Sequence, residues 1–197
     1  EPYLQYLGYQ SDLNCDIRFG DYDTIVQDAM AGEAELLGEN TNCVLIFARL
    51  ENLSWPLARN FAGLDGAAIT AEVERISQFV ETAVAAIRRH TKVLILWHGL
   101  ELPSYPATGI LDSQGPSGQR SVIASLNETI CSILAATESA YFVDLDGCFS
   151  RLGYDACLDN RFWHIARAPY TTRALGETAA EDFKFIRAAL GRNKKCL

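Results

Sequence analysis

The sequence predicts an α/β fold: a mostly parallel sheet between two layers of helices, that is, a three-layer sandwich. Short unbroken apolar runs, typical of strands buried on both faces of a parallel sheet, alternate with longer segments whose apolar residues recur every three or four positions. Such alternation indicates strand–helix–strand crossovers. With 197 residues and 49% hydrophobic content, the chain is long enough to bury a sizeable core, and we expect a single domain spanning residues 1–197.

The strands are predicted at Cys43 to Phe47, Val93 to Trp97 and Tyr141 to Val143, where the apolar runs lie. Thr70 to Arg89 is the clearest helix, because its apolar residues share one helical face. Two further amphipathic helices are indicated, one containing the apolar residues from Val122 to Leu134 and one those from Leu175 to Leu190.

The opening Tyr3 to Tyr9 is predicted to be the end of a helix stopped at Gly8, and Leu13 to Ile17 a short strand. The first strand of the sheet would then precede the first residue. Loops are predicted at 31–42, 51–68 and 102–118. The last is long and rich in Pro and Gly, which favours a lid, a binding loop or disorder.

The net charge of −8 is unevenly spread: residues 1–150 carry −12 and residues 151–197 carry +4. The acidic part argues against nucleic acid as a partner. The basic C-terminal part suits phosphates or an acidic protein, unless it pairs with acidic surfaces of the same fold. No apolar run approaches the roughly 20 residues that span a bilayer, and the acidic start is unlike a signal peptide. We therefore expect no membrane partner and a cytoplasmic protein.

The six cysteines include no C-x-x-C pair, which disfavours structural zinc. Cys15, Cys43 and Cys131 lie in apolar or strand-like runs, where a free cysteine is usually a small core residue. A reducing compartment fits this pattern better than an oxidising one.

His98 directly follows a predicted strand, and Glu101 lies three residues further on. Both side chains could project at the carboxyl end of the strand, where the sites of α/β sheets collect. The alternative is a histidine that caps the strand beside a solvated glutamate, because position alone does not establish a reacting pair.

A second candidate segment runs from Asp159 to Thr171, where Arg161, His164 and Arg167 alternate with aromatic and apolar residues. Such a pattern can hold polar groups together over an apolar support. Asp159 and His164 are separated by four residues. They could pair if the segment is not a regular helix, unless Arg161 takes the carboxylate instead.

The order of motifs carries a resemblance. The patterns D-x-R-x-W from Asp159, A-R-x-P-Y-T from Ala166, a helix, and then G-x-x-K-K-C-L ending at Leu197 are similar to the N-terminal portion of the FkbH-like proteins of bacterial polyketide pathways. The resemblance covers nearly the whole chain. Its upstream motifs are Phe19-Gly20-Asp21-Tyr22, Val44 to Phe47, Glu101-Leu102-Pro103, Leu126-Asn127 and Val143-Asp144-Leu145-Asp146.

The resemblance implies an SGNH-hydrolase-like domain of flavodoxin-like topology, cut from a longer protein that continues into a HAD-superfamily phosphatase domain. Members are expected to load a glyceryl unit from a phosphoglyceryl donor onto an acyl carrier protein. Mg²⁺ is expected in the absent phosphatase domain, and no cofactor is expected in this one. Cys196 would then lie at the mouth of the phosphatase strand, where it could carry a glyceryl thioester; the alternative is a core cysteine.

The sequence departs from an active SGNH hydrolase. It has no G-D-S motif, His98 stands where an oxyanion asparagine is sought, and the spacing of Asp159 and His164 is not D-x-x-H. These departures argue against hydrolysis by this domain alone. The remaining alternatives are a stand-alone SGNH-type esterase or acyltransferase, and a non-catalytic domain that docks a carrier protein.

Asp144-Leu145-Asp146 after an apolar run resembles the nucleophile motif of HAD phosphatases. Only 51 residues follow it, too few for the other groups that hold Mg²⁺ and phosphate, and Cys148 replaces the expected Thr or Val. We expect an ordinary acidic strand end here.

Overall fold

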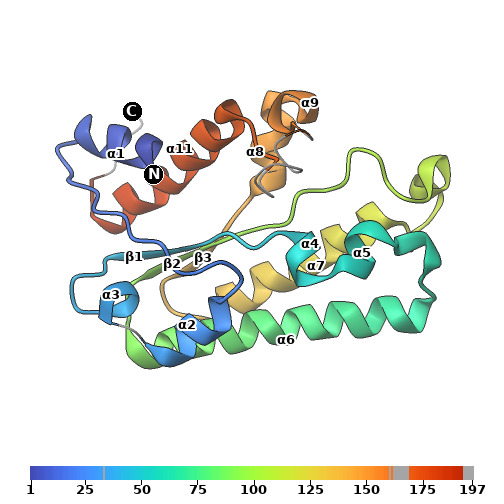
Figure 1. Ribbon diagram of the computed structural model, residues 1–197, viewed down its shortest axis with the longest axis horizontal. Helices are drawn as coiled ribbons and strands as arrows, with labels where there is room; N and C mark the ends of the chain where they lie inside the picture. Colours follow the sequence, from blue (N-terminus) through green and yellow to red (C-terminus); the bar gives the residue numbers. More distant parts are fainter. Residues whose placement is uncertain (33, 160, 162–168, 193–197) are drawn as a thin grey trace. The chain divides into compact units, whose positions relative to one another are not determined.

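The structure is a computed structural model of the chain, and it describes residues 1–32, 34–159, 161 and 169–192 (Figure 1). The chain forms two compact units. One unit consists of Phe19–Phe142, and the other of Glu1–Arg18 with Val143–Leu197.

The sheet contains three strands in the order β1-β2-β3. They span Cys43–Ile46, Leu94–His98 and Ala140–Val143. β1 and β2 are parallel, and their register places Ile46 opposite Trp97. All five residues of β2 are buried, as expected of a central strand. The predicted strands and the predicted α/β class with a parallel sheet are confirmed.

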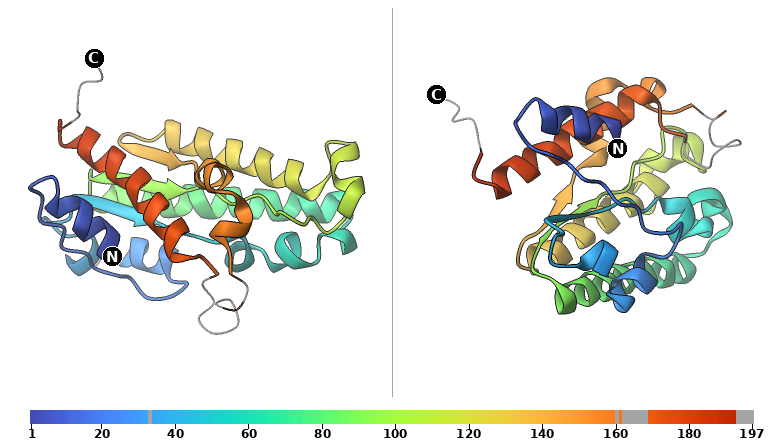
Figure 2. Two further views of the ribbon diagram at one scale, coloured as in Figure 1. Left: turned by 90° about the horizontal axis from the view of Figure 1, so that it is seen from above. Right: turned by 60° about the vertical axis from the view of Figure 1, so that its left-hand side comes forward.

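Two long helices cover one face of this sheet, α6 (Gly66–His90) and α7 (Gln119–Ala135). Because β1, β2 and β3 follow one another in both sequence and space, right-handed crossovers bring both connecting helices to the same face. Figures 1 and 2 show α6 and α7 running alongside each other. Their apolar faces and alternate strand residues form one core, which includes Ile46, Val80, Val84, Ile95, Trp97, Ile123, Leu126 and Ile130.

α6 contains the predicted helix 70–89 and begins four residues earlier. Asp65 caps it, because its carboxylate accepts a hydrogen bond from the backbone N–H of Ala68 at 2.8 Å. At the other end, Arg88 donates to the carbonyl oxygens of Val93 and Glu138 at 2.8 and 2.9 Å. This side chain therefore fixes the segments that enter β2 and β3.

Two of the predicted loops contain helices. The range 31–42 includes α3 (Ala34–Leu37) after α2 (Ile25–Ala31), which packs on α6. The range 51–68 is largely helical. These helices are short and irregularly spaced, so no apolar periodicity indicated them; they are α4 (Leu50–Leu53), α5 (Trp55–Arg59) and η1 (Phe61–Gly63).

The segment 102–118 contains one short element, the 3₁₀ helix η2 (Gly109–Gln114). Two buried polar side chains anchor it. Asp112 Oδ1 accepts from the backbone N–H of Gln119 at 2.6 Å and from the hydroxyl of Thr108 at 3.0 Å. Gln119 in turn accepts from the N–H of Ala107 and donates to the carbonyl oxygen of Leu57, both at 2.8 Å.

The other unit is helical in its described part and is built around α11 (Thr172–Ala189), which α1 (Pro2–Tyr9) and α8 (Leu145–Leu152) contact. The short α9 (Tyr154–Cys157) follows α8. The third predicted helix is thus confirmed. The strand predicted at 13–17 was wrong: these residues are extended but form no strand, and Leu13, Cys15 and Ile17 pack against the cluster of α1 and α11.

The cysteines differ from the expectation. Cys148 and Cys157 are buried, Cys15 and Cys43 are half-buried, and Cys131 is exposed. Cys131 follows the buried Ile130 on α7, so the helical rotation of about 100° per residue turns it away from the core. On a helix, apolar neighbours in the sequence therefore do not show that a residue itself is buried.

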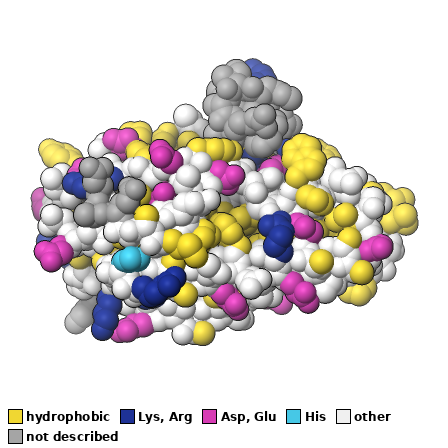
Figure 3. Space-filling view, turned by 60° about the horizontal axis from the view of Figure 1, so that its bottom comes forward, with side chains coloured by type: hydrophobic (Ala, Val, Ile, Leu, Met, Phe, Trp, Pro, Cys, Tyr) yellow, Lys and Arg dark blue, Asp and Glu magenta, His cyan; other side chains and the backbone are white. Residues whose placement is uncertain are grey.

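In the described ranges, no helix is long and apolar enough to cross a membrane. On the face in Figure 3, acidic and basic side chains are interspersed with hydrophobic ones.

Candidate functional site at the carboxyl ends of β1 and β2

The carboxyl ends of β1 and β2 lie next to each other, because the strands are parallel and paired up to Ile46 and Trp97. Phe47 and Arg49 follow β1, and His98 and Glu101 lie at the end of β2 and just beyond it. His98 and Glu101 therefore lie where the sequence placed them. This edge is where α/β sheets usually bind ligands.

His98 is buried, with 2% of its surface exposed. Its Nδ1 lies 2.9 Å from the carbonyl oxygen of Ile46, which can only accept, so Nδ1 carries the proton and donates it. The imidazole also packs on the ring of Phe47, with the ring centres 4.7 Å apart. In the neutral imidazole, Nε2 is consequently the nitrogen that accepts a hydrogen bond or a proton.

Arg49 lies between two carboxylates. Its Nη2 is 3.0 Å from Oε2 of Glu51 and 3.0 Å from Oε1 of Glu101. All three side chains are nearly buried, with 12%, 11% and 11% exposed. Arg59 adds a second guanidinium, 2.9 Å from Glu51. Sequence analysis selected Glu101 and missed its partners; a signal that could have indicated them is the charged pair at 49 and 51 directly after an apolar strand.

Burial raises the pKa of the Glu101 carboxyl, while Arg49 acts in the opposite direction. A carboxyl group with a raised pKa, beside a guanidinium and at a strand end, is a candidate for proton transfer or for binding a polar ligand. Glu101 lies three residues beyond His98, the last residue of β2.

The loop that carries Glu101 is fixed by Asn127 of α7. The amide oxygen of Asn127 accepts from the N–H of Leu100, and its amide nitrogen donates to the carbonyl oxygen of Leu100, both at 2.8 Å. Gly99 is held closely as well, since a side chain there would meet the ring of Phe142. The position of Glu101 is thus set by a helix and by β3.

Asp159 and Arg161 form a pair in the other unit. Asp159 accepts from Nε of Arg161 at 2.9 and 3.1 Å, from its Nη2 at 2.5 Å and from its backbone N–H at 3.0 Å. The side-chain hydrogen bond from Arg161, followed by the backbone one, lowers the pKa of Asp159. The same side-chain hydrogen bond, followed by the charge of Asp159, raises the pKa of Arg161. Arg161 therefore takes this carboxylate, one of the two arrangements considered from the sequence.

The pair lies where the chain enters the segment 159–169. Leu158 forms an antiparallel bridge with Tyr170, and the N–H of Asp159 donates to the carbonyl oxygen of Pro169 at 2.6 Å. Arg161 itself has 85% of its side chain exposed. The other predicted site residues, His164, Arg167 and Cys196, lie outside the described residues.

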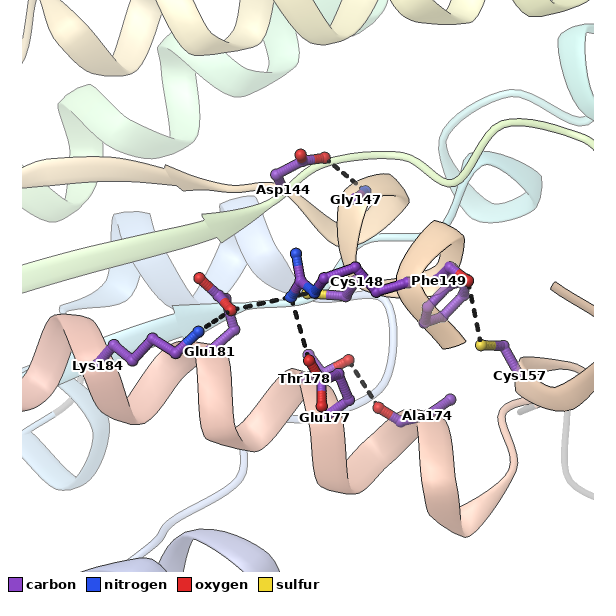
Figure 4. Close-up of polar contacts among 11 residues, drawn as sticks. Asp144, Gly147, Cys148, Phe149, Cys157, Ala174, Glu177, Thr178, Glu181 and Lys184 are labelled. Carbon is purple, nitrogen blue, oxygen red and sulfur yellow. Dashed lines mark hydrogen bonds and ion pairs between the residues drawn. The ribbon is translucent and has the colours of Figure 1, made fainter. Parts of the chain in front are cut away.

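The motif Asp144-Leu145-Asp146 has a structural explanation. Asp144 is the N-cap of α8, where its carboxylate accepts from the N–H of Gly147 at 2.9 Å (Figure 4). Asp146 accepts a hydrogen bond from the hydroxyl of Tyr154. Both acidic groups thus contribute to local structure at the start of α8.

Figure 4 also shows an ionic network on α8 and α11. The guanidinium of Arg151 lies 3.2 Å from Glu177 and 3.1 Å from Glu181, and 3.4 Å from Sγ of Cys148. Burial raises the pKa of the Cys148 thiol despite this neighbour. Cys148 is fully buried and is therefore a core residue, not a reactive thiol. Among the residues that the structure describes, no three His, Cys, Asp or Glu side chains gather as a metal site requires.

Comparisons with known proteins support the fold. No protein-family model matches the sequence, and no curated protein matches it. A crystal structure does match: the N-terminal part of the protein BF1531 from Bacteroides fragilis, which contains a phosphatase domain and was complexed with Mg. The TM-score is 0.79 at 13% sequence identity.

The match covers 98% of this chain and 49% of the chain in that structure, so the present chain spans about half of the neighbour's length. At 13% identity the likeness shows the fold alone. The α/β fold of this chain is thus one that occurs in a phosphatase-domain-containing protein.

Proposed function

We propose that this chain is the N-terminal domain of a protein whose phosphatase domain follows it, and that the protein loads a glyceryl unit from a phosphoglyceryl donor onto an acyl carrier protein. The observation that carries this proposal is the fold match over 98% of the chain to half of a structure that also contains a phosphatase domain. The motif order from Asp159 to Leu197, which resembles the FkbH-like proteins, supports the finer assignment.

In this proposal the strand-end cluster, which consists of Arg49, Glu51 and Glu101, binds the polar end of the donor. The carboxyl of Glu101 and the guanidinium of Arg49 offer a proton-exchanging group and a fixed cation within 3.0 Å of each other. Cys196 would carry the glyceryl unit as a thioester, formed when its thiolate attacks the acyl carbon of an acyl-phosphate donor, the bond from that carbon to the phosphate oxygen breaks and phosphate leaves. The phosphatase chemistry, with its Mg²⁺, belongs to the following domain.

The test uses the longer protein encoded by the gene, purified with its carrier protein and a phosphoglyceryl donor. Intact mass spectrometry of the carrier should show the added glyceryl mass, and the gene should encode a D-x-D-x-T strand directly after Leu197. A stop codon at that point, or a carrier whose mass never changes, would overturn the assignment. Steady turnover of a short-chain aryl ester by the 197-residue chain alone would instead support the stand-alone esterase.

Arg161 supports a docking role within the same proposal. Its guanidinium is exposed yet oriented by three hydrogen bonds to Asp159, and guanidinium groups suit phosphates and carboxylates. We expect Arg161 and Arg167 to contact the acidic carrier protein. Such a contact should weaken with salt, since exposed charges are screened over about 8 to 10 Å at physiological ionic strength.

Calorimetry at low and high salt measures this contact. The double variant Arg161→Ala/Arg167→Ala should bind the carrier at least about tenfold more weakly, a loss of about 1.4 kcal/mol. Lys184→Ala is the control, because Lys184 is also basic, exposed and paired with a carboxylate, that of Glu181, but lies on α11 and not in the segment 159–169. If the double variant and the control bind the carrier protein equally tightly, Arg161 and Arg167 do not dock it.

A further inference from the structure

Tyr22 and Asn52 form a hydrogen-bonded pair on the helix that carries part of the strand-end cluster. The side-chain amide nitrogen of Asn52 donates to the hydroxyl oxygen of Tyr22 at 2.9 Å, although 30 residues separate them in the sequence. Asn52 directly follows Glu51 on α4, and Arg49 is the N-cap of that helix. Because consecutive Cα atoms are about 3.8 Å apart, the pair adjoins the segment that holds Arg49 and Glu51.

The pair is open to a ligand. Tyr22 is 72% exposed, and Asn52 is exposed as well. Among the described residues, the hydrogen bond between them is the one that each side chain makes. Since the hydroxyl oxygen of Tyr22 accepts from Asn52, the hydroxyl proton points elsewhere and can be donated, while the amide oxygen of Asn52 can accept. The pair therefore offers one donor and one acceptor, and neither carries a charge.

The turn that carries Tyr22 is fixed before a ligand binds. The hydroxyl of Thr24 lies 2.7 Å from Oδ2 of Asp28, and Gly20 approaches the same oxygen so closely that a Cβ there would lie 2.6 Å from it. Asp23 adopts a positive φ of 64°, a conformation that L side chains rarely take. A preformed turn lowers the ordering cost of binding at Tyr22.

The charges beside the pair are balanced. Arg49 is bound to Glu51 and Glu101, and Arg59 is bound to Glu51, so two guanidiniums face two carboxylates when both carboxylates are ionised. Such a set gives an anion little net attraction. A hydroxyl group, in contrast, can donate to a carboxylate and accept from a guanidinium. These surroundings favour a neutral, hydroxyl-bearing group over a phosphate.

We propose that the Tyr22–Asn52 pair recognises a hydroxyl group of the glyceryl unit. This inference rests on the proposed function and refines it, because it states which part of the donor lies beside the strand-end cluster. The ligand hydroxyl accepts from Tyr22 and donates to the amide oxygen of Asn52, so all three groups are satisfied. A site built to bond a hydroxyl discriminates against an analogue that lacks it.

Two probes that differ by one hydroxyl test the pair: 3-phosphoglycerate, and 3-phosphooxypropionate, which lacks the 2-hydroxyl. Calorimetry measures their binding to the 197-residue chain, so that no phosphatase domain contributes. The parent should prefer 3-phosphoglycerate at least about fivefold, as hydrogen bonds to one neutral hydroxyl allow. Tyr22→Phe should remove most of this preference by weakening 3-phosphoglycerate alone, and Asn52→Ala should reduce it too. A change that only disturbs the local structure would weaken both probes alike.

Tyr6→Phe is the matched control. The hydroxyl of Tyr6 also accepts from a side-chain amide, that of Gln10 at 2.7 Å, and Tyr6 is 59% exposed, but it lies on α1 in the other unit. This variant should keep the preference of the parent, and circular dichroism confirms that each variant is folded. A folded parent that binds neither probe or both alike would overturn the inference, as would a Tyr22→Phe variant that keeps the preference.

The mass of the carrier protein reports on the proposed function separately. If the preference depends on Tyr22 but the carrier mass never changes, the hydroxyl site stands and the loading assignment falls. If the carrier is loaded but the parent shows no preference between the probes, the loading assignment stands and the Tyr22–Asn52 pair has no part in it.

Discussion

Arg49 and Glu101 lie 52 residues apart in the sequence, yet Nη2 of Arg49 is 3.0 Å from Oε1 of Glu101. The parallel register of β1 and β2 accounts for this contact, because each residue follows its strand by a few positions on the same edge of the sheet. Glu51 approaches the same nitrogen, so one nearly buried guanidinium serves two carboxylates.

Replacing Arg49 by Leu should lower the free energy of unfolding by about 3–5 kcal/mol, because two nearly buried carboxylates lose their shared partner. Urea unfolding followed by circular dichroism measures the change. Arg59→Leu is the control: Arg59 is 46% exposed, and an exposed pair contributes at most about 1 kcal/mol. Equal losses of unfolding free energy in the two variants would show that the ion pairs of Arg49 contribute no more to stability than an exposed ion pair does.

Glu101→Gln should change how stability depends on pH. The folded state raises the pKa of Glu101, so it binds this proton more tightly than the unfolded chain does. The contribution of Glu101 to the free energy of unfolding is therefore fully present at low pH. It falls as the pH rises from the pKa of an ordinary Glu, about 4.3, to the raised pKa of the folded state. The difference between parent and variant should therefore decline over that window. A difference that grows with pH would mean that Arg49 outweighs burial and lowers the pKa.

Asn127→Ala should cost about 1–3 kcal/mol of unfolding free energy, because the N–H and C=O of Leu100 both lose their partner. Asn127→Asp keeps the acceptor, loses the donor and should fall between the parent and Asn127→Ala. Thr129→Ala should be nearly neutral, because the hydroxyl of the half-buried Thr129 donates only within the same helix, to the carbonyl oxygen of Ser125. Thermal and urea unfolding of the three variants check this order.

Asp144→Ala should destabilise the chain by about 0.5–2 kcal/mol, while Asp144→Asn should retain most of the stability, because both Asp and Asn cap helices well. Calorimetric titration with Mg²⁺ provides the second measurement. If Asp144 were a metal-binding nucleophile, the parent would bind Mg²⁺ and Asp144→Asn would lose that binding.

The sheet and the long helices were predictable because each has a pattern that local physics enforces. The run from Leu94 to Trp97 is apolar throughout because the strand is buried on both faces, and α6 shows its buried stripe every three or four residues. α4, α5 and η1 were not predicted because each has only three to five residues, too few for any periodicity.

The candidate site was only partly predictable for a related reason. Strand ends can be located from the sequence, which selected His98 and Glu101. The partners Arg49 and Asn127 come from distant segments, and only the strand register and the packing of α7 bring them to this edge. The capping role of Asp144 was likewise not predicted. The sequence shows the acidic motif, but not that the backbone N–H of Gly147 lies where it can donate to the carboxylate of Asp144.

Gln119, on α7, joins two other segments through its side-chain amide: the amide oxygen accepts from the N–H of Ala107, and the amide nitrogen donates to the carbonyl oxygen of Leu57 in α5. Hydrogen exchange at Ala107 should therefore require α5 and the segment 102–118 to separate together, as one cooperative unit. The slow exchange of this amide, on a segment with no strand partner, would distinguish a fixed part of the framework from an ordinary surface loop.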